Sequence, residues 1–132
     1  MSEDFYLRVN RICAQDARYP SDAYEFVMQA LFFTQKRLKR PGHISAQELL
    51  DGVKEYAIDQ FGPMSHAVLE HWGITATEDL GNIVFNMVEN GLLKKTEDDK
   101  LEDFKGAYDL KQEFVQGYRR YLEKQIEGNN LL

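Results

Sequence analysis

Cysteine, proline and long apolar runs are all scarce in this chain of 132 residues. Because Cys13 is the only cysteine, an internal disulfide is excluded, and one thiol cannot form a zinc site by itself. A single cysteine is typical of a reducing compartment. No stretch reaches the roughly 18 apolar residues that a membrane-spanning helix needs, and the acidic residues 1–4 lack the apolar segment of a signal peptide. We therefore predict a cytoplasmic protein with no membrane segment.

Positive charge is also limited, since 16 Lys and Arg stand against 22 Asp and Glu, for a net charge of −6. The deficit is uneven along the chain. Residues 1–43 carry a small basic excess, whereas residues 44–93 contain one lysine, Lys54, and eight acidic residues. Phosphate contacts supply most non-specific affinity for nucleic acids. This charge balance disfavours a generic binder of nucleic acid or of an anionic membrane.

The composition that remains is that of an ordinary globular domain, with 43% hydrophobic and 29% charged residues. These values exclude a disordered, collagen-like or membrane class. A chain of this length forms one domain and can bury one hydrophobic core without a stabilising disulfide or metal. We therefore predict a single domain over residues 1–132.

Apolar residues recur at helical spacing along most of the chain. The pattern predicts N-terminal helices within residues 3–40, further helices at about 45–61, 63–72 and 77–90, and a C-terminal helix at 109–127. Ser45 and Glu48 have the spacing of a capping box. Gly91 has the position of a left-handed helix stop.

Residues 92–96 and 101–104 flank the turn-forming sequence 97–100 and predict two short strands of a β-hairpin. Helices followed by such a hairpin resemble a winged-helix domain. The predicted fold is therefore mainly α, or α+β with a small β-hairpin. It has a winged-helix-like core at 44–110, flanked by the N-terminal helices 3–40 and the C-terminal helix 109–127.

A winged helix suggests DNA binding, but the helix that would enter the groove, at 77–90, contains no Lys or Arg. The sequence instead favours a non-enzymatic protein-interaction or regulatory module that acts through apolar patches and an acidic face. The alternative is an atypical nucleic-acid-associated winged-helix regulator. It would use the basic patch of Lys36, Arg37, Lys39 and Arg40, although basic residues in a last turn also suit the helix dipole.

Five residues form the candidate interaction surface: Phe26, Phe33, Glu78, Asn82 and Phe85. Phe26 and Phe33 lie opposite the main apolar stripe of their helix, which is then either sandwiched in a core or buried against a partner chain. Phe85 lies off its own stripe and packs either under the N-terminal helices or against a partner. If both helices expose these second faces, a homodimer is plausible.

Catalytic patterns are weak. His66 and Glu70 share a helical face, but His71 lies about 140° from His66, so one helix cannot present both histidines to a metal. Surface residues are the favoured interpretation, and an enzyme that uses His66 or His71 is a weak third class. The acidic cluster at 98–103 lacks EF-hand spacing and favours a solvated loop. We predict no catalytic residue, metal or cofactor.

Several longer strings resemble the Minf-type family of short conserved bacterial proteins. They include 43–50, 56–63, 71–73, 77–86 and 91–93, within a resemblance that covers most of residues 5–115. The resemblance implies a small cytoplasmic bacterial protein. It carries no activity, cofactor or catalytic residue with it, so the partner, the ligand and the oligomeric state stay open at this point.

Overall fold

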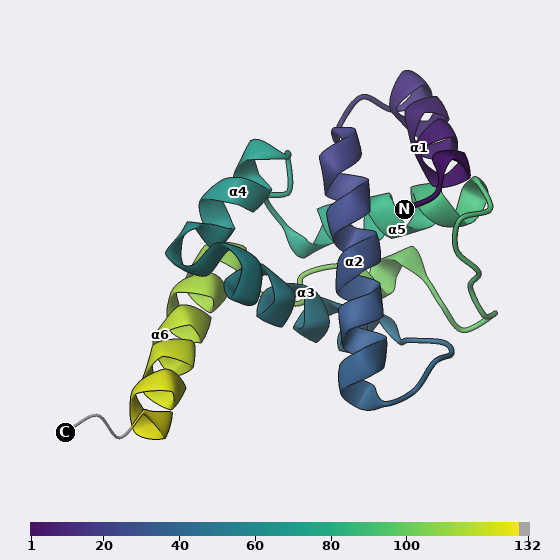
Figure 1. Ribbon diagram of the computed structural model, residues 1–132. Coiled ribbons are helices and arrows are strands. Elements are labelled where there is room, and N and C mark those ends of the chain that lie inside the picture. Colours follow the sequence, from purple (N-terminus) through teal and green to yellow (C-terminus); the bar gives the residue numbers. More distant parts are fainter. Residues whose placement is uncertain (130–132) are drawn as a thin grey trace.

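The computed structural model describes residues 1–129, and over that range it is built from helices joined by short loops (Figure 1). The α-helices are α1 (Glu3–Gln15), α2 (Ser21–Leu38), α3 (Ala46–Phe61), α4 (Ser65–His71), α5 (Thr77–Glu89) and α6 (Leu110–Gly128). Two short 3₁₀ helices, η1 (Gly62–Met64) and η2 (Leu101–Phe104), lie between them. The predicted helices are all present, with bounds close to those expected.

The predicted β-hairpin is wrong, because no strand occurs among residues 1–129. The α+β winged-helix-like core at 44–110 is therefore also wrong. Asp99 Oδ2 accepts the Thr96 amide at 2.8 Å, and Asp103 Oδ2 accepts the Lys100 amide at 3.1 Å. These aspartates satisfy the backbone of the loop locally, in the way side chains cap turns, so the two segments form no ladder with each other.

Two predicted helix ends are confirmed. The Glu48 amide donates to Ser45 Oγ and the Ser45 amide donates to Glu48 Oε1, which completes the capping box of α3. Gly91 adopts φ +74°, and the Leu92 amide donates to the Met87 carbonyl at 2.9 Å. That pattern is the left-handed stop expected after α5.

Helix α2 lies at the centre of the arrangement (Figure 1). It packs on α3, and on another side it contacts α1 and α5. Helices α3 and α4 support α6, while η2 packs against α5 and α3. The long-range contacts therefore join early and late parts of the chain.

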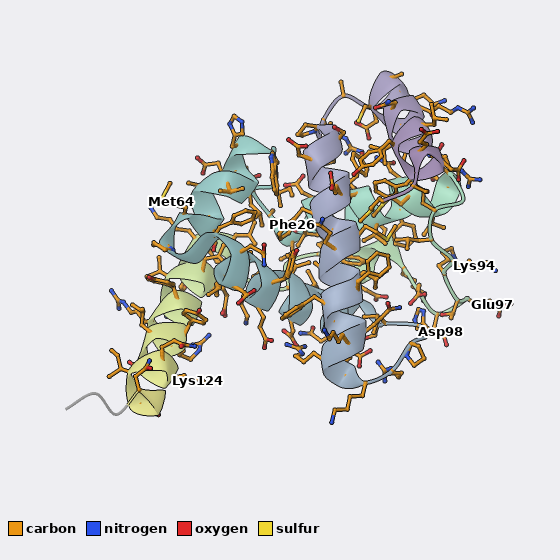
Figure 2. The ribbon with its side chains drawn as sticks, viewed as in Figure 1. Phe26, Met64, Lys94, Glu97, Asp98 and Lys124 are labelled. Atoms are coloured by element: carbon orange, nitrogen blue, oxygen red, sulfur yellow. The ribbon has the colours of Figure 1, made fainter. Side chains whose placement is uncertain are left out.

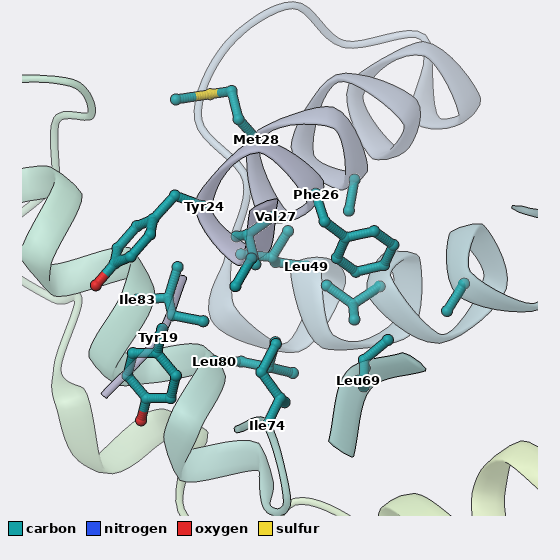
Figure 3. Close-up of a cluster of buried hydrophobic side chains, with 14 of the residues drawn as sticks. Tyr19, Tyr24, Phe26, Val27, Met28, Leu49, Leu69, Ile74, Leu80 and Ile83 are labelled. Carbon is teal, nitrogen blue, oxygen red and sulfur yellow. The ribbon is translucent and has the colours of Figure 1, made fainter. Parts of the chain in front are cut away.

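The core is formed by buried side chains from every α-helix, including Tyr24, Val27, Leu49, Leu69, Leu80 and Ile83 (Figure 3). On the opposite side of α2, Phe26 is only 3% exposed and packs on Tyr56, Phe61 and Trp72. At the level of Phe26, the second apolar face of α2 is therefore covered by other residues of this chain, as its main face is. Of the two alternatives for this residue, the sandwiched helix is the observed one.

Candidate functional site

One apolar hollow that could hold a ligand is a cavity of about 340 Å³. It lies between the C-terminal half of α2, the loop before α3, the C-terminal half of α5, and residues 93–104. Its floor consists of apolar side chains: Leu31, Ile44, Leu49, Val84, Phe85, Val88, Leu93 and Phe104. We call this cavity the α2–α5 pocket.

Local sequence shapes the floor of the α2–α5 pocket. Ile44 precedes the capping box of α3, and Leu49 follows it on the buried face of that helix. Phe85 meets Phe104 of η2 edge to face, with ring centroids 6.5 Å apart. Since Gly81 has no side chain, η2 can lie directly against α5 and bring Phe104 into this position.

One side of the rim is held by hydrogen bonds. His43 Nε2 lies 3.3 Å from Asp99 Oδ1, and the other carboxylate oxygen of Asp99 accepts the Thr96 amide. Gln35 Nε2 donates to the Gly42 carbonyl at 2.9 Å, which ties the loop before α3 to α2. The rim is therefore built by contacts between three separate segments.

Three lysines complete the rim: Lys94, Lys95 and Lys100. All three are exposed, and none forms an ion pair with another of residues 1–129. Figure 2 shows Lys94 on the outer side of the loop, near Glu97 and Asp98. The rim therefore carries these three lysines together with Asp99 and Asp103, whose carboxylates accept the Thr96 and Lys100 amides, above an apolar floor.

Among the candidate interaction residues, only Phe85 lines the α2–α5 pocket. Phe26 is buried, and Phe33 is half-buried against Tyr56. Glu78 is exposed and accepts the Gly106 amide, which lowers its pKa. Asn82 donates to the Tyr19 hydroxyl at 3.0 Å. The structure does not bring these five residues together into one surface.

The candidate basic patch is partly neutralised by neighbouring carboxylates. Arg37 pairs with Glu55, and Arg40 pairs with Glu48 at 2.5 Å. The hydrogen bond from Arg40 lowers the pKa of Glu48 to about 2, with help from the Ser45 amide. Lys36 and Lys39 are exposed at the end of α2. Two of the four cations are therefore already engaged.

The histidine-containing string of α4 forms no compact cluster. His66 Nε2 lies 3.7 Å from Glu70 Oε2, and His71 is exposed. Within residues 1–129 no three His, Cys, Asp or Glu side chains meet in a way that could hold a metal ion. In the same range no helix has both the length and the apolar character needed to cross a membrane.

A polar network that the sequence pattern does not predict joins α5 to residues 16–19 and to the start of α2. The Tyr19 hydroxyl donates to Asp79 Oδ1 at 2.5 Å, and Asn86 Nδ2 donates to Asp16 and to the Tyr24 hydroxyl, each at 3.0 Å. Burial, with the bond to Asp79, raises the pKa of Tyr19 to about 12.

The same network holds an ion pair at its edge. Arg18 donates to both carboxylate oxygens of Asp16, and this holds the pKa of Asp16 well below its usual range. A signal for the network was present in the sequence, since two asparagines one turn apart interrupt the apolar pattern of α5. Tyr19 and Tyr24 are almost fully buried, so these hydrogen bonds join α5 to the start of α2 inside the protein.

Comparison of the chain with family models, with curated proteins and with solved structures found no match. The resemblance to the Minf-type family therefore stays a prediction.

Proposed function

We propose that this chain is a non-enzymatic protein-interaction module, and that the α2–α5 pocket is its docking site. The partner is a protein segment that inserts one large apolar side chain and carries carboxylates on either side of it. The observation that carries the proposal is the combination of an apolar floor with three rim lysines that form no ion pair within residues 1–129.

The size of the pocket supports an anchor of this kind. Ligand-binding cavities span about 300–1,000 Å³, so a volume of about 340 Å³ lies at the lower end of that range. Binding energy at protein interfaces is concentrated in a few anchor side chains that fill such hollows. One aromatic or large aliphatic side chain contacting Leu31, Val84 and Phe85 meets that description.

Charge supports the choice of an acidic segment. Residues 44–93 contain eight acidic residues and one lysine, whereas the pocket rim carries three lysines against two aspartates, Asp99 and Asp103. Both aspartates accept backbone amides, so the lysines are the rim charges left to attract carboxylates. Complementary rim charges steer partners and suppress wrong ones more than they add affinity. The lysines therefore favour segments in which carboxylates flank the apolar anchor over segments in which they do not. The basic patch carries no comparable argument, because Arg37 and Arg40 are paired.

The test uses a defined peptide, acetyl-Glu-Glu-Phe-Glu-Glu-amide, titrated into ¹⁵N-labelled protein while amide shifts are followed by NMR. We expect saturable shifts confined to residues around Val84, Val88 and 93–100. A peptide with lysine in place of glutamate, and one with alanine in place of phenylalanine, should bind more weakly. Charge reversal by Lys94→Glu with Lys95→Glu should raise the dissociation constant about tenfold.

The matched control is Lys111→Glu with Lys124→Glu, which changes the net charge equally at exposed positions on α6. It should leave the dissociation constant unchanged. Equal losses in both double variants, or shifts spread over the whole chain, would contradict docking at the pocket. Saturable binding of decanoate with no binding of the peptide would overturn the protein partner in favour of a small amphipathic anion.

A further inference from the structure

Helix α6 leaves the body of the protein before it ends. Leu110, Phe114 and Gly117 are buried against the other helices, whereas every residue from 119 to 129 is exposed. In Figure 1 this yellow segment extends away from the remaining helices toward the C-terminal end. Helical segments of fewer than about 12 residues have little stability in water without tertiary contacts. A partner that packs on the exposed end of α6 would therefore stabilise it.

Helix α6 also carries an apolar stripe beside its buried face, and this stripe runs from Val115 into the exposed segment. The stripe consists of Val115, Tyr118, Leu122 and Ile126. Their spacing of three and four residues places them on one side of the helix, about 100° around from Phe114. Ile126 is 73% exposed, and Val115 and Leu122 are exposed by 46% and 40%. Tyr118 is half-buried against the core, so the uncovered part of the stripe consists of Val115, Leu122 and Ile126.

Charges beside the stripe change sign along the helix. Arg119 lies on its flank in the first half, and Glu123 and Glu127 follow on the same flank. None of the three forms an ion pair with another of residues 1–129. When two copies of a helix pair antiparallel, each flank meets the same flank of the other copy. The basic half then faces the acidic half.

We propose that α6 pairs antiparallel with α6 of a second copy of this chain, about a two-fold axis that passes near Arg120 and Tyr121. In this arrangement Val115 lies opposite Ile126 of the second copy, and Arg119 lies opposite Glu123 of the second copy. A parallel pair would instead place the Arg119 flank against the Tyr121 and Gln125 flank, which has no charge to offer it. The charge pattern therefore selects a second copy and its orientation.

The expected dimer is weak. Val115 and Ile126 are about 17 Å apart along the helix, so a contact along this stripe is much smaller than the roughly 1,600 Å² of a standard interface. We expect a dissociation constant of about 0.1–1 mM, in the range of transient contacts. This inference is independent of the proposed docking pocket, which lies on other elements.

The first test is analytical ultracentrifugation of the full chain up to about 1 mM. The weight-average mass should rise above 15.4 kDa toward twice that value. Arg119→Glu, or Glu123→Arg, should raise the dissociation constant about tenfold, because like charges then face each other. The double variant Arg119→Glu with Glu123→Arg should restore it to within about threefold. Arg11→Glu, at an exposed position on α1, is the control for net charge.

The second test fixes the orientation. Two chains in a Cys13→Ser background, one with Val115→Cys and one with Ile126→Cys, are mixed and oxidised. Antiparallel pairing predicts a disulfide between positions 115 and 126 well above the statistical half of all crosslinks. Far-ultraviolet circular dichroism confirms that each variant is folded. A chain that stays monomeric at the highest concentration, or crosslinks that join mainly identical positions, would overturn the proposal.

Discussion

At the scale of single residues, the polar contacts of α5 explain how two tyrosine hydroxyls are accommodated in the core. Asn82 and Asn86 lie one turn apart and reach the hydroxyls of Tyr19 and Tyr24, respectively. Both tyrosines are almost fully buried. A buried hydroxyl without a partner costs about 1–3 kcal/mol. Asp79 and Asn82 both bond the hydroxyl of Tyr19, and Asn86 bonds that of Tyr24, so both rings enter the core without that penalty. These bonds also fix how α5 lies against the start of α2.

The Tyr19 hydroxyl makes a contribution to stability that depends on pH. Its pKa is about 12 in the folded protein, compared with 10.0 for an unperturbed tyrosine. A raised folded pKa means that this contribution is complete below about pH 10 and is lost as the pH rises toward about 12. We expect Tyr19→Phe to lower the free energy of unfolding by about 1–2 kcal/mol at neutral pH. The deficit should shrink between pH 10 and pH 12.

Urea denaturation at a series of pH values measures this difference. Tyr121→Phe is the control, because that side chain is exposed and its hydroxyl has no hydrogen bond to the rest of residues 1–129. A Tyr19→Phe deficit that stayed constant up to pH 12 would contradict the role assigned to the hydroxyl.

At the scale of the elements, the contact between α2 and α3 depends on a glycine. A Cβ atom at Gly52 would lie 1.7 Å from Thr34 Oγ1 and 2.9 Å from Thr34 Cβ. Thr34 is fully buried, and its hydroxyl donates to the Ala30 carbonyl at 2.7 Å. The buried Thr34 side chain therefore fills the space that a side chain at position 52 would need. The contact joins the two helices that contribute Leu31 and Leu49 to the α2–α5 pocket.

Gly52→Ala should therefore destabilise the protein, even though alanine is the better helix former. Overpacking of a core costs about 1–3 kcal/mol, against less than about 1 kcal/mol gained in helix propensity. Thermal or urea unfolding measures the change. Thr34→Ala in the same chain removes the nearest atoms and should recover part of the loss, as a double-mutant cycle would show. Gly42→Ala, with open space around position 42, should be close to neutral. A stabilising Gly52→Ala would contradict the close approach.

At the scale of the whole molecule, the buried residues form one cluster that extends from Phe5 in α1 to Phe114 in α6. Trp72 is the only tryptophan, and it packs against Phe26 and Phe61 on the far side of α2 from the contacts with α1 and α5. A shared core of this kind unfolds as one unit in most domains of this size.

We therefore expect tryptophan fluorescence and far-ultraviolet circular dichroism to give coincident urea transitions. The fluorescence reports on the packing around Trp72, whereas the dichroism reports on all helices. Measurements belong at low protein concentration, where the pairing of α6 proposed above contributes nothing. Two separated transitions would show that residues 1–132 do not form the single cooperative domain predicted from the chain length.

Much of this fold was predictable because its signals are local. Ser45 and Glu48 mark the start of α3, and Gly91 marks the end of α5, through bonds within a few residues. The prediction of a hairpin was wrong because local hydrogen bonds, which composition does not reveal, determine the conformation of residues 96–103. Asp99 and Asp103 have the composition of a turn between strands, and the sequence alone does not show that their side chains bond the Thr96 and Lys100 amides.

The site was harder to predict, because its parts are distant in sequence. Leu31, Ile44 and Phe104 have no mutual signal in the chain and meet only after α2, α3 and η2 have packed. Phe85 was identified as unusual because it lies off the buried stripe of its helix, and it is the one candidate interaction residue that lines the pocket. Amphipathic spacing identifies which side chains need cover, but it does not identify what covers them.

The α2–α5 pocket has a thermodynamic consequence that follows from its construction. Its walls come from residues between Leu31 and Phe104, so no unfolded or partly assembled chain possesses the site. A ligand that binds only the native state shifts the folding equilibrium by mass action, by about 2.7 kcal/mol at a hundredfold excess over its dissociation constant. Binding at the pocket therefore raises the free energy of unfolding. A rise in melting temperature consequently detects a ligand of any chemical class.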